Sequence, residues 1–149
     1  MTPKQLELYL HQHIPLTNAM QISILEIANE GVVVSAPLAP NINHRDTVFG
    51  GSASAVAILA AWAFVHTRLL SEGIKSRLVI QRNKMEYDLP IDGTFTAHSS
   101  LVNPLDWDKF TQTLQRRGRA RITILCVLKY QGQEVGHFEG QFVAMKIDD

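Results

Sequence analysis

The sequence predicts an α+β domain in which an antiparallel sheet of about six strands curls around one long helix. Three observations support this prediction. Residues 53–65 are apolar almost all the way round, which is typical of a helix in the middle of a protein. The segments with a period of two follow one another as hairpins. They do not alternate with helices, which argues against a doubly wound parallel sheet.

Length and composition fit a single domain over residues 1–149. A chain of 149 residues can bury one good core, and 46% hydrophobic with 19% charged residues indicates a globular chain. The 14 basic and 14 acidic residues cancel, so there is no overall attraction to nucleic acid or to a membrane. Electrostatic recognition therefore has to come from a local patch.

The chain begins with a predicted helix. Thr2 is placed to cap it, Pro3 fits its first position, and Gln5 can reach back as in a capping box. Pro15 ends the apolar pattern that follows. The first segment of the chain is therefore expected to be a short helix that leads into the sheet.

A hairpin is predicted next. Residues 20–28 and 32–36 have the period of strands, and Gly31 is placed in the turn between them. Pro37 and Pro40 end the second strand and lead into a loop that is rich in asparagine.

The central helix is predicted to follow the glycine pair at 50–51 and to continue to Leu70, with Gly73 as its stop. Its fully apolar part, residues 53–65, is shorter than the roughly 20 residues that span a bilayer. The N-terminus lacks the basic segment and apolar run of a signal peptide. We therefore expect a cytoplasmic protein.

The second half of the chain is predicted to supply four strands, at residues 76–87, 94–102, 119–130 and 134–146. Asp106 is placed to cap a short helix in which Trp107, Phe110 and Leu114 share one side. A sheet curled round one helix leaves an edge strand open, which a second copy would cover. A homodimer or a dimer of dimers is therefore expected.

The segment that leads into the central helix is the candidate site. Residues 43–52 are rich in side-chain amides and hydroxyls and include Gly50-Gly51. The first N–H groups of a helix have no partner inside it and lie at the positive end of its dipole. Two glycines let another molecule approach these groups, so the helix start suits a developing oxyanion or an anionic ligand.

Two other nucleophile candidates are weak. Cys126, the only cysteine, lies in an apolar strand with no basic neighbour, so we expect a buried and unreactive thiol. Ser52 and Ser54 have no His-Asp pair at a readable spacing, so we expect them to serve the helix start.

The candidate site resembles that of the hot-dog thioesterase superfamily. Residues Asn43–Gly51 are similar to its Asn-x-x-Gly-Thr-x-His-Gly-Gly motif, with Asp46 where Gly is usual and Phe49 where His is frequent. Residues 87–93 are similar to the strand-Pro-x-x-Gly turn of that fold. The resemblance covers essentially the whole chain and implies the hot-dog architecture.

Within the superfamily, the chain most resembles the thioesterase-like domain that also occurs fused behind a GNAT acetyltransferase in some bacterial proteins. This likeness is carried by Pro40–Asn43, Thr47, Phe49–Ser52 and the Arg-Gly-Arg-Ala-Arg run at 117–121. The likeness implies decarboxylation of malonyl-ACP to acetyl-ACP at the initiation of fatty acid synthesis, whereas the wider superfamily hydrolyses acyl-CoA and acyl-ACP.

Both reactions would use the same helix start. The backbone N–H of Gly51 is the expected donor to the thioester oxygen, with Phe49, Gly50 and Ser52 beside the substrate. The acyl group would arrive on the phosphopantetheine of acyl carrier protein (ACP) or CoA. No further cofactor and no metal are expected.

The two reactions differ in what else they need. Hydrolysis needs an activated water or a nucleophile, and His-Gly-Gly thioesterases usually place an acid about two turns past the glycines. Here that position is Ala57-Ile58-Leu59. Asp46 lies before the helix and is either a relocated base or a turn residue. Decarboxylation needs no base, because an oxyanion donor stabilises the enolate directly.

The leading hypothesis is therefore decarboxylation, with Asn43 as the residue that orients the substrate and Thr47 or Asn41 in support. A neutral amide orients a malonyl group without repelling its carboxylate. His44 is the candidate proton donor, and the alternative is an ordinary exposed loop histidine. Hydrolysis of acyl thioesters and non-catalytic binding of an acyl carrier are the alternatives.

The run from Gln115 to Arg121 is the one concentrated positive patch. Strand alternation predicts Arg117, Arg119 and Arg121 on one side, with Arg116 next to them. That side would contact CoA phosphates or the acidic helix of ACP, or it would only discourage edge pairing. Zero net charge and the lack of aromatic residues in the run disfavour nucleic acid.

Overall fold

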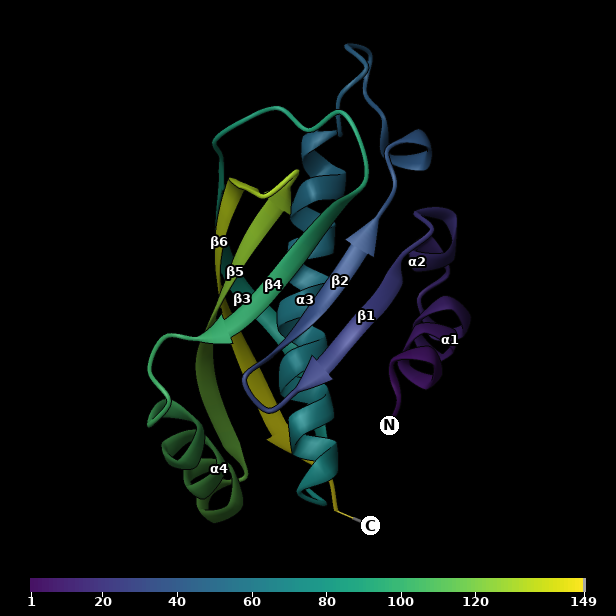
Figure 1. Cartoon of the computed structure of the whole chain (residues 1–149). Coiled ribbons are helices and arrows are strands. Elements are labelled where there is room, and N and C mark those ends of the chain that lie inside the picture. Colours follow the sequence, from purple (N-terminus) through teal and green to yellow (C-terminus); the bar gives the residue numbers. More distant parts are fainter. Residues whose placement is uncertain (149) are drawn as a thin grey trace.

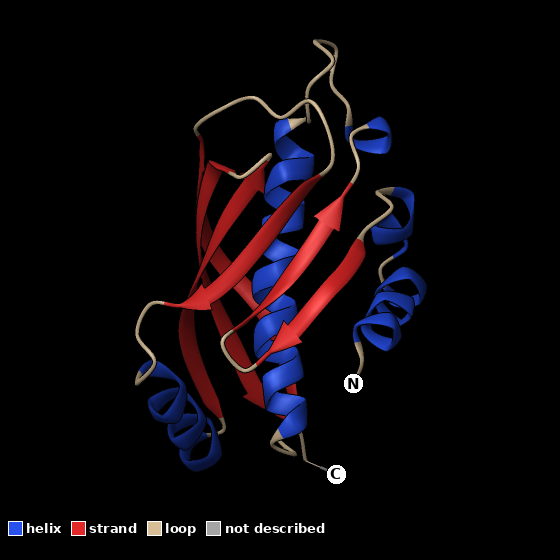
Figure 2. Cartoon of the chain, viewed as in Figure 1, coloured by secondary structure: helices blue, strands red, loops and turns tan. Residues whose placement is uncertain are grey.

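A computed structural model describes residues 1–148 and shows an antiparallel sheet curled around one long helix (Figure 1, Figure 2). The sheet order is β1-β2-β4-β5-β6-β3, and every neighbouring pair is antiparallel. The α+β prediction is confirmed, and β1 and β3 are the edge strands. The strands are β1 (Ser23–Ala28), β2 (Gly31–Ala36), β3 (Ser76–Tyr87), β4 (Phe95–Leu101), β5 (Arg119–Tyr130) and β6 (Gln133–Lys146).

The N-terminal helix α1 (Pro3–His13) starts as predicted. Gln5 N donates to Thr2 Oγ1 over 3.1 Å, and Thr2 N donates to Gln5 Oε1 over 2.9 Å, which completes the capping box. A further helix, α2 (Pro15–Ala19), follows at once. The sequence analysis missed it because Pro15 both ends one helix and fits the first position of another.

The β1–β2 hairpin forms, but Gly31 is not in its turn. The turn is Asn29-Glu30, and Gly31 is the first residue of β2, paired with Ala28. A Cβ on Gly31 would lie 1.9 Å from the carbonyl oxygen of Ser99 on β4. The glycine is therefore required by the close approach of two strands and not by a turn conformation.

The central helix α3 (Gly50–Ser71) lies inside the curl of the sheet, and Gly73 with φ +71° follows its end as predicted (Figure 1). By length and composition the whole of α3 could cross a membrane, although its fully apolar part, residues 53–65, is shorter than a span. The helix is longer than that run because Gly50–Ser52 and the segment after Val65 also belong to it. Its position, however, is that of a core helix, with most of its length buried inside the sheet.

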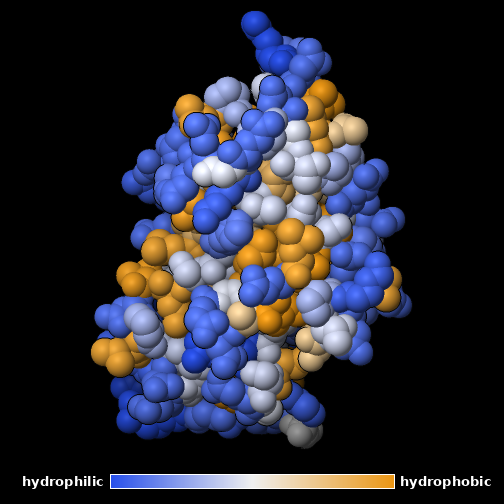
Figure 3. Space-filling model, in the orientation of Figure 1, coloured by the Kyte–Doolittle hydropathy of each residue, from blue (hydrophilic) through white to orange (hydrophobic). Residues whose placement is uncertain are grey.

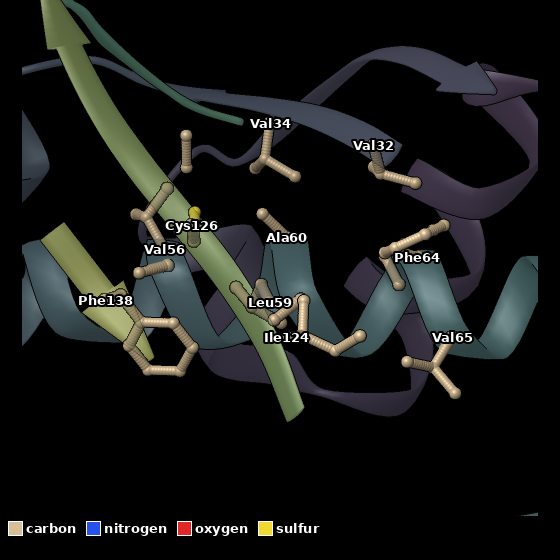
Figure 4. Close-up of a cluster of buried hydrophobic side chains, with 14 of the residues drawn as sticks. Val32, Val34, Val56, Leu59, Ala60, Phe64, Val65, Ile124, Cys126 and Phe138 are labelled. Carbon is tan, nitrogen blue, oxygen red and sulfur yellow. The ribbon is translucent and has the colours of Figure 1, made fainter. Parts of the chain in front are cut away.

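Side chains from four elements meet around α3 in the core (Figure 4). Val56 and Phe64 of the helix are fully buried and face β2, β5 and β6. Burying a side chain of this kind contributes about 1.5–3 kcal/mol relative to leaving it exposed. Cys126 of β5 points into the same core at 1% exposure, and burial raises its pKa to about 12. The prediction of a buried thiol is confirmed.

The second half of the chain follows the prediction closely, apart from one cap. Helix α4 (Asp106–Arg117) begins after Leu105, and Asp106 lies in its first turn instead of capping it. The carboxylate of Asp106 accepts a hydrogen bond from Asn103 N over 3.2 Å and so closes the preceding turn. The predicted apolar side of the helix is buried as expected: Trp107, Phe110 and Leu114.

Candidate functional site

The start of α3 leaves three backbone donors free. Phe49 is the N-cap residue, with φ −59° and ψ 133°, and its side chain caps nothing. The first helical hydrogen bond runs from Ala53 N to Phe49 O over 3.0 Å. Within residues 1–148, the N–H groups of Gly50–Ser52 therefore have no hydrogen-bond partner. They lie at the positive end of the helix dipole, where an anion is stabilised.

Backbone hydrogen bonds hold this helix start in place from two directions. Val48 N donates to Ile91 O over 2.8 Å, in the loop after β3, and Phe49 N donates to Asn41 O over 2.7 Å. The residues ahead of the helix are thus tied to two separate loops at the top of Figure 1. Free donors on a fixed backbone are pre-organised, because they need not reorient when a ligand arrives.

A pocket of about 300 Å³ lies beside the helix start. Gly50 and Ala53 form its helical wall, and Met85 and Tyr87 of β3 are also among its lining residues. A Cβ built on Gly50 would lie 3.5 Å from the Tyr87 ring. Residues 49–52 are therefore neither part of a strand nor sealed from every cavity, as the oxyanion hypothesis requires.

The ring of Phe49 lies against Gly51. A Cβ built on Gly51 would lie 2.5 Å from an atom of the Phe49 ring. Phe49 itself is 56% exposed. Gly51 thus leaves room for the Phe49 side chain, whereas Gly50 leaves room for the pocket. The predicted oxyanion donor Gly51 and the predicted substrate-binding residues Phe49, Gly50 and Ser52 are together at one helix end.

No acid follows the glycines along α3. The first ionisable side chain of the helix is His66, about four turns further on. Burial lowers the pKa of His66, which stacks on Trp62 at a centroid distance of 4.4 Å. The helix therefore brings neither a base nor a negative charge to the pocket.

Hydrogen bonds between Asn43 and Thr47 close the loop that precedes the helix. Asn43 Nδ2 donates to Thr47 Oγ1 over 2.9 Å, and Asn43 Oδ1 accepts from Thr47 N over 3.1 Å and from Arg45 N over 2.8 Å. Asn43 N also donates to Thr47 O over 2.8 Å. The carboxamide that was expected to orient the substrate is thus occupied within its own loop.

His44 and Asp46 lie in the exposed part of this loop, which projects beyond the helix start (Figure 1). Asp46 has φ +65°, a left-handed conformation, which explains why glycine is usual at this position of the motif. Asp46 is not among the residues that line the pocket. Of its two predicted roles, base and turn residue, the geometry favours the turn.

Asn41 is buried and does not face the pocket. It is 2% exposed, and its Nδ2 donates to Met20 O over 3.0 Å and to Pro37 O over 2.8 Å. These bonds tie the loop before the helix to the start of the sheet. In this structure Asn41 braces the backbone that holds Phe49 N, and its support of a substrate stays a prediction.

Sequence reasoning missed a titratable group that lines the pocket, Asp88, and its partner His137. Asp88, which lines the pocket, accepts a hydrogen bond from His137 Nδ1 over 2.5 Å, and His137 Nε2 lies 3.1 Å from Glu134 Oε1. The hydrogen bond to Asp88, and then that to Glu134, raises the pKa of His137. No sequence signal could reveal this group, because it depends on the register between β3 and β6.

The arginine run divides between two elements. Arg116 and Arg117 end α4, Gly118 turns the chain with φ +77°, and Arg119 opens β5. The prediction that Arg117 shares a strand face with Arg119 and Arg121 is wrong, because α4 extends through Arg117. The run lies at the α4 end of the molecule, far from the start of α3 (Figure 1). Figure 3 shows strongly hydrophilic atoms at both of these ends.

Comparisons with known proteins agree with this architecture. Residues 3–146 match the family described as "Putative thioesterase (yiiD_Cterm)". A protein of unknown function from Chlorobaculum tepidum TLS is 26% identical, with a TM-score of 0.89 over 97% of this chain and 94% of that one. A structure described as "putative thioesterase" from Shewanella oneidensis is 26% identical, with a TM-score of 0.84 over 96% of each chain.

A more distant thioesterase, from Haemophilus influenzae, shares the fold at 12% identity, with a TM-score of 0.79 over 100% of this chain and 94% of that one. These neighbours have hot-dog thioesterase folds, and the fold expected from the resemblance is confirmed.

Proposed function

Because the chain belongs to the family described as "Putative thioesterase (yiiD_Cterm)", we propose that it is an acyl-thioester enzyme that decarboxylates a malonyl thioester to an acetyl thioester. The single observation that supports this most strongly is the start of α3. It offers free N–H donors at Gly50–Ser52 next to a pocket, on a helix that contains no acid.

The donors suit the charge that develops in this reaction. An oxyanion-hole donor typically contributes about 3–4 kcal/mol of barrier lowering. In the decarboxylation, the thioester oxygen becomes an enolate oxygen and stays at the same donor. A second negative charge beside the malonyl carboxylate would weaken binding. No acid on this stretch of α3 adds such a charge, and the carboxylate of Asp88, on another wall of the pocket, is paired with His137.

The step balances without a further reactant. The bond between the carboxylate carbon and C2 breaks, and CO2 leaves. The electron pair of that bond forms the C1–C2 double bond, and the thioester oxygen takes the negative charge while accepting a hydrogen bond from Gly51 N. C2 then takes one proton, for which we propose His44 of the projecting loop, and the C–S bond stays intact.

Asn43 is a positioning residue in this proposal. Its side chain bonds to Thr47 and to the backbone, so it fixes the loop that carries His44 and leads to the glycines. Direct orientation of the malonyl carboxylate by Asn43 would require these bonds to open. Thr47 acts with it as the other half of the same brace.

The carrier and the cell compartment follow the resemblance. We propose that the acyl group arrives on the phosphopantetheine of ACP or CoA, without another cofactor, and that the protein works in the cytoplasm. Arg116, Arg117 and Arg119 are the proposed contacts to the phosphates or to an acidic carrier surface.

We also propose a homodimer through the open edge of β3, with a dimer of dimers as the larger assembly. β3 is a long edge strand of 12 residues, and Val79 in it is 45% exposed. Such an edge presents unpaired backbone groups that a second copy can satisfy. A two-fold axis would pair the two β3 strands antiparallel.

Thioester hydrolysis is the second candidate, and one observation favours it. Asp88 is a carboxylate at the pocket beside Gly50, and His137 holds it in place over 2.5 Å. A carboxylate so placed can take a proton from an attacking water. In that reaction the thioester C–S bond would break and the free thiol would be released.

One product assay separates the candidates. The purified protein is given malonyl-ACP, malonyl-CoA and a series of unsubstituted acyl thioesters, and CO2 and free thiol are both measured. Decarboxylation predicts CO2 and an acetyl thioester, in equal amounts, with no early thiol. Free thiol without CO2 would replace this proposal by hydrolysis, and binding without turnover would replace it by a carrier-binding module.

Asp88→Asn provides the matched variant for this assay. It keeps the shape of the side chain and a hydrogen-bond partner for His137, but removes the base. Decarboxylation predicts that CO2 release stays within a few-fold of the parent. Loss of turnover by a factor of about 100 or more would mark Asp88 as a general base.

A further inference from the structure

The end of β3 lies beside the start of α3. Tyr87 is the last residue of β3 and is paired with Gly136 of β6. The next two backbone N–H groups both donate to Val135 O, over 3.0 and 3.1 Å. The loop that continues from there passes beside the helix start and accepts the hydrogen bond from Val48 N described above (Figure 1). The position of Tyr87 relative to the helix start is therefore fixed through the backbone on both sides.

The ring of Tyr87 lies against Gly50 and brings its hydroxyl to the helix start. A Cβ built on Gly50 would lie 3.5 Å from Cε1, 3.7 Å from Cζ and 3.9 Å from the hydroxyl oxygen of Tyr87. The Cα–Cβ bond of a helical residue tilts towards the N-terminus of the helix, which is also the direction in which the free N–H groups point. The hydroxyl therefore lies on the side of Gly50 where a ligand oxygen would meet those donors.

The Tyr87 hydroxyl is not used by the protein itself. Within residues 1–148 it forms no hydrogen bond, and the residue is 58% exposed. A phenolic hydroxyl is both a donor and an acceptor, and its hydrogen turns to suit the partner that arrives. The hydroxyl also carries no charge when it donates, so it does not repel the carboxylate of a malonyl group.

Few other side chains at the pocket have polar atoms. Among the described residues that line it, Tyr87 and Asp88 are the two with a side-chain oxygen or nitrogen. Asp88 is paired with His137, and an ionised carboxylate only accepts hydrogen bonds, so it does not stabilise an oxygen that becomes negative. Asn43 is occupied within its own loop. Tyr87 is therefore the side-chain donor that this pocket offers to a reacting group.

We propose that Tyr87 is a further catalytic residue, whose hydroxyl donates a second hydrogen bond to the thioester oxygen beside the bond from Gly51 N. A carbonyl oxygen has two lone pairs and accepts two donors. Both bonds strengthen as negative charge develops on that oxygen, so the hydroxyl stabilises the transition state more than the bound substrate. The proposal rests on the proposed acyl-thioester function and adds a side-chain donor to its backbone donor.

Steady-state kinetics of Tyr87→Phe test the catalytic role, because this variant removes the hydroxyl and keeps the ring against Gly50. The matched control is Tyr9→Phe, which removes a hydroxyl from α1, where Tyr9 stacks on His66 outside the pocket. On malonyl-pantetheine, kcat should fall about 100-fold in Tyr87→Phe, with KM within about three-fold of the parent, and the control should change neither. A higher KM with unchanged kcat would place the hydroxyl on the malonyl carboxylate and overturn the proposal, as would unchanged kinetics.

Infrared spectra test the same contact without turnover. The probe is a ketone analogue of acetyl-pantetheine, in which a methylene group replaces the sulfur and the carbonyl carbon is isotopically labelled. It has no carboxylate and no thioester bond to cleave. Hydrogen bonds to a carbonyl oxygen lower its stretching frequency, so binding to the parent protein should lower it and Tyr87→Phe should reverse part of that change. Equal frequencies in the parent and Tyr87→Phe would overturn the proposal, and Tyr9→Phe should match the parent.

The two measurements separate this proposal from the proposed function. If no thioester is turned over but the ketone frequency depends on the Tyr87 hydroxyl, the proposed function fails and the hydrogen bond is confirmed. If malonyl-pantetheine is decarboxylated equally fast by the parent and by Tyr87→Phe, the proposed function stands and the role of Tyr87 fails. A ketone that does not bind to the parent protein would overturn the contact itself.

Discussion

The two ends of α3 are built in opposite ways. At the C-terminal end, Trp107 Nε1 donates to Glu72 Oε2 over 2.7 Å, and the guanidinium of Arg68 lies 4.5 Å from the centre of the Trp107 ring. That ring also stacks near Phe64, with centroids 6.3 Å apart. At the N-terminal end, the helix starts with two glycines and three donors without partners.

The comparison indicates that the C-terminal end of α3 serves stability and the N-terminal end serves binding. One end is capped, stacked and covered by α4, so the helix is anchored there by its own chain. The other end is held by backbone hydrogen bonds and by the bonds between Asn43 and Thr47, and its free N–H groups are left for a ligand. An unpaired donor lowers stability in the free protein, but it adds binding energy when an anionic group arrives. The following changes test this division.

Trp107→Ala should have the largest effect on stability. It removes a ring that is 1% exposed and leaves a cavity, so we expect a loss of about 3–5 kcal/mol in the free energy of unfolding. Urea denaturation measures it, with Leu105→Ala, at a position 77% exposed, as the control. A loss below about 1 kcal/mol, the usual range of surface changes, would show that this end does not anchor the helix.

Glu72→Ala should cost less, because it removes an acceptor and not a ring. Trp107 Nε1–H loses its partner in a nearly buried place, which costs about 1–3 kcal/mol. Glu72→Gln keeps an oxygen for the same hydrogen bond and should recover most of this loss. Equal losses in the two variants would mean that the charge on Glu72, through Arg68 at 3.7 Å, matters more than the hydrogen bond.

Asn43→Ala should make the loop before the N-terminal end of α3 more mobile without unfolding the protein. The loop loses the bonds of Asn43 to Thr47 and Arg45, so the amides of residues 45–48 should exchange faster. Global stability should fall by no more than about 1–2 kcal/mol. A loss of turnover should accompany the faster exchange if the loop positions the site, and unchanged turnover would remove Asn43 from the proposal.

The pKa values of two histidines should be shifted in opposite directions from the ordinary value. Hydrogen bonds to Asp88 and Glu134 raise the pKa of His137, so its contribution to stability is present below pH 6.5 and is lost as pH rises through the folded value. Burial lowers the pKa of His66, so stability is lost as pH falls from 6.5 through its folded value.

Histidine chemical shifts against pH measure both groups. Asp88→Asn should bring the pKa of His137 back towards 6.5 and leave that of His66 unchanged. The same pKa for His137 in the variant and the parent would show that the pair at the rim does not persist in solution.

The sequence predicted those features that depend on neighbours along the chain. The apolar run after Gly51, the stop at Gly73 and the capping box of Thr2 and Gln5 are local patterns, and the structure confirms all three. Gly31 was misplaced because its requirement comes from Ser99, 68 positions further on.

In the candidate site, too, the local features were predictable and the features that depend on distant residues were not. The unpaired helix start was predictable, because it needs only two glycines ahead of an apolar helix. The pair of Asp88 and His137 depends on strand register, which a single sequence does not specify. The bonds that occupy Asn43 were missed because an amide that braces its own loop and one that faces a ligand have the same sequence pattern.

The most direct test of the central claim compares Gly51→Pro with Gly51→Ala on malonyl-ACP. Both add a Cβ against the Phe49 ring, and both are compatible with the first turn of a helix, but only proline removes the N–H. If that N–H stabilises the enolate oxygen, kcat should be about 100- to 1,000-fold lower for proline than for alanine. Equal kcat values in the two folded variants would contradict the assignment of Gly51 as the oxyanion donor.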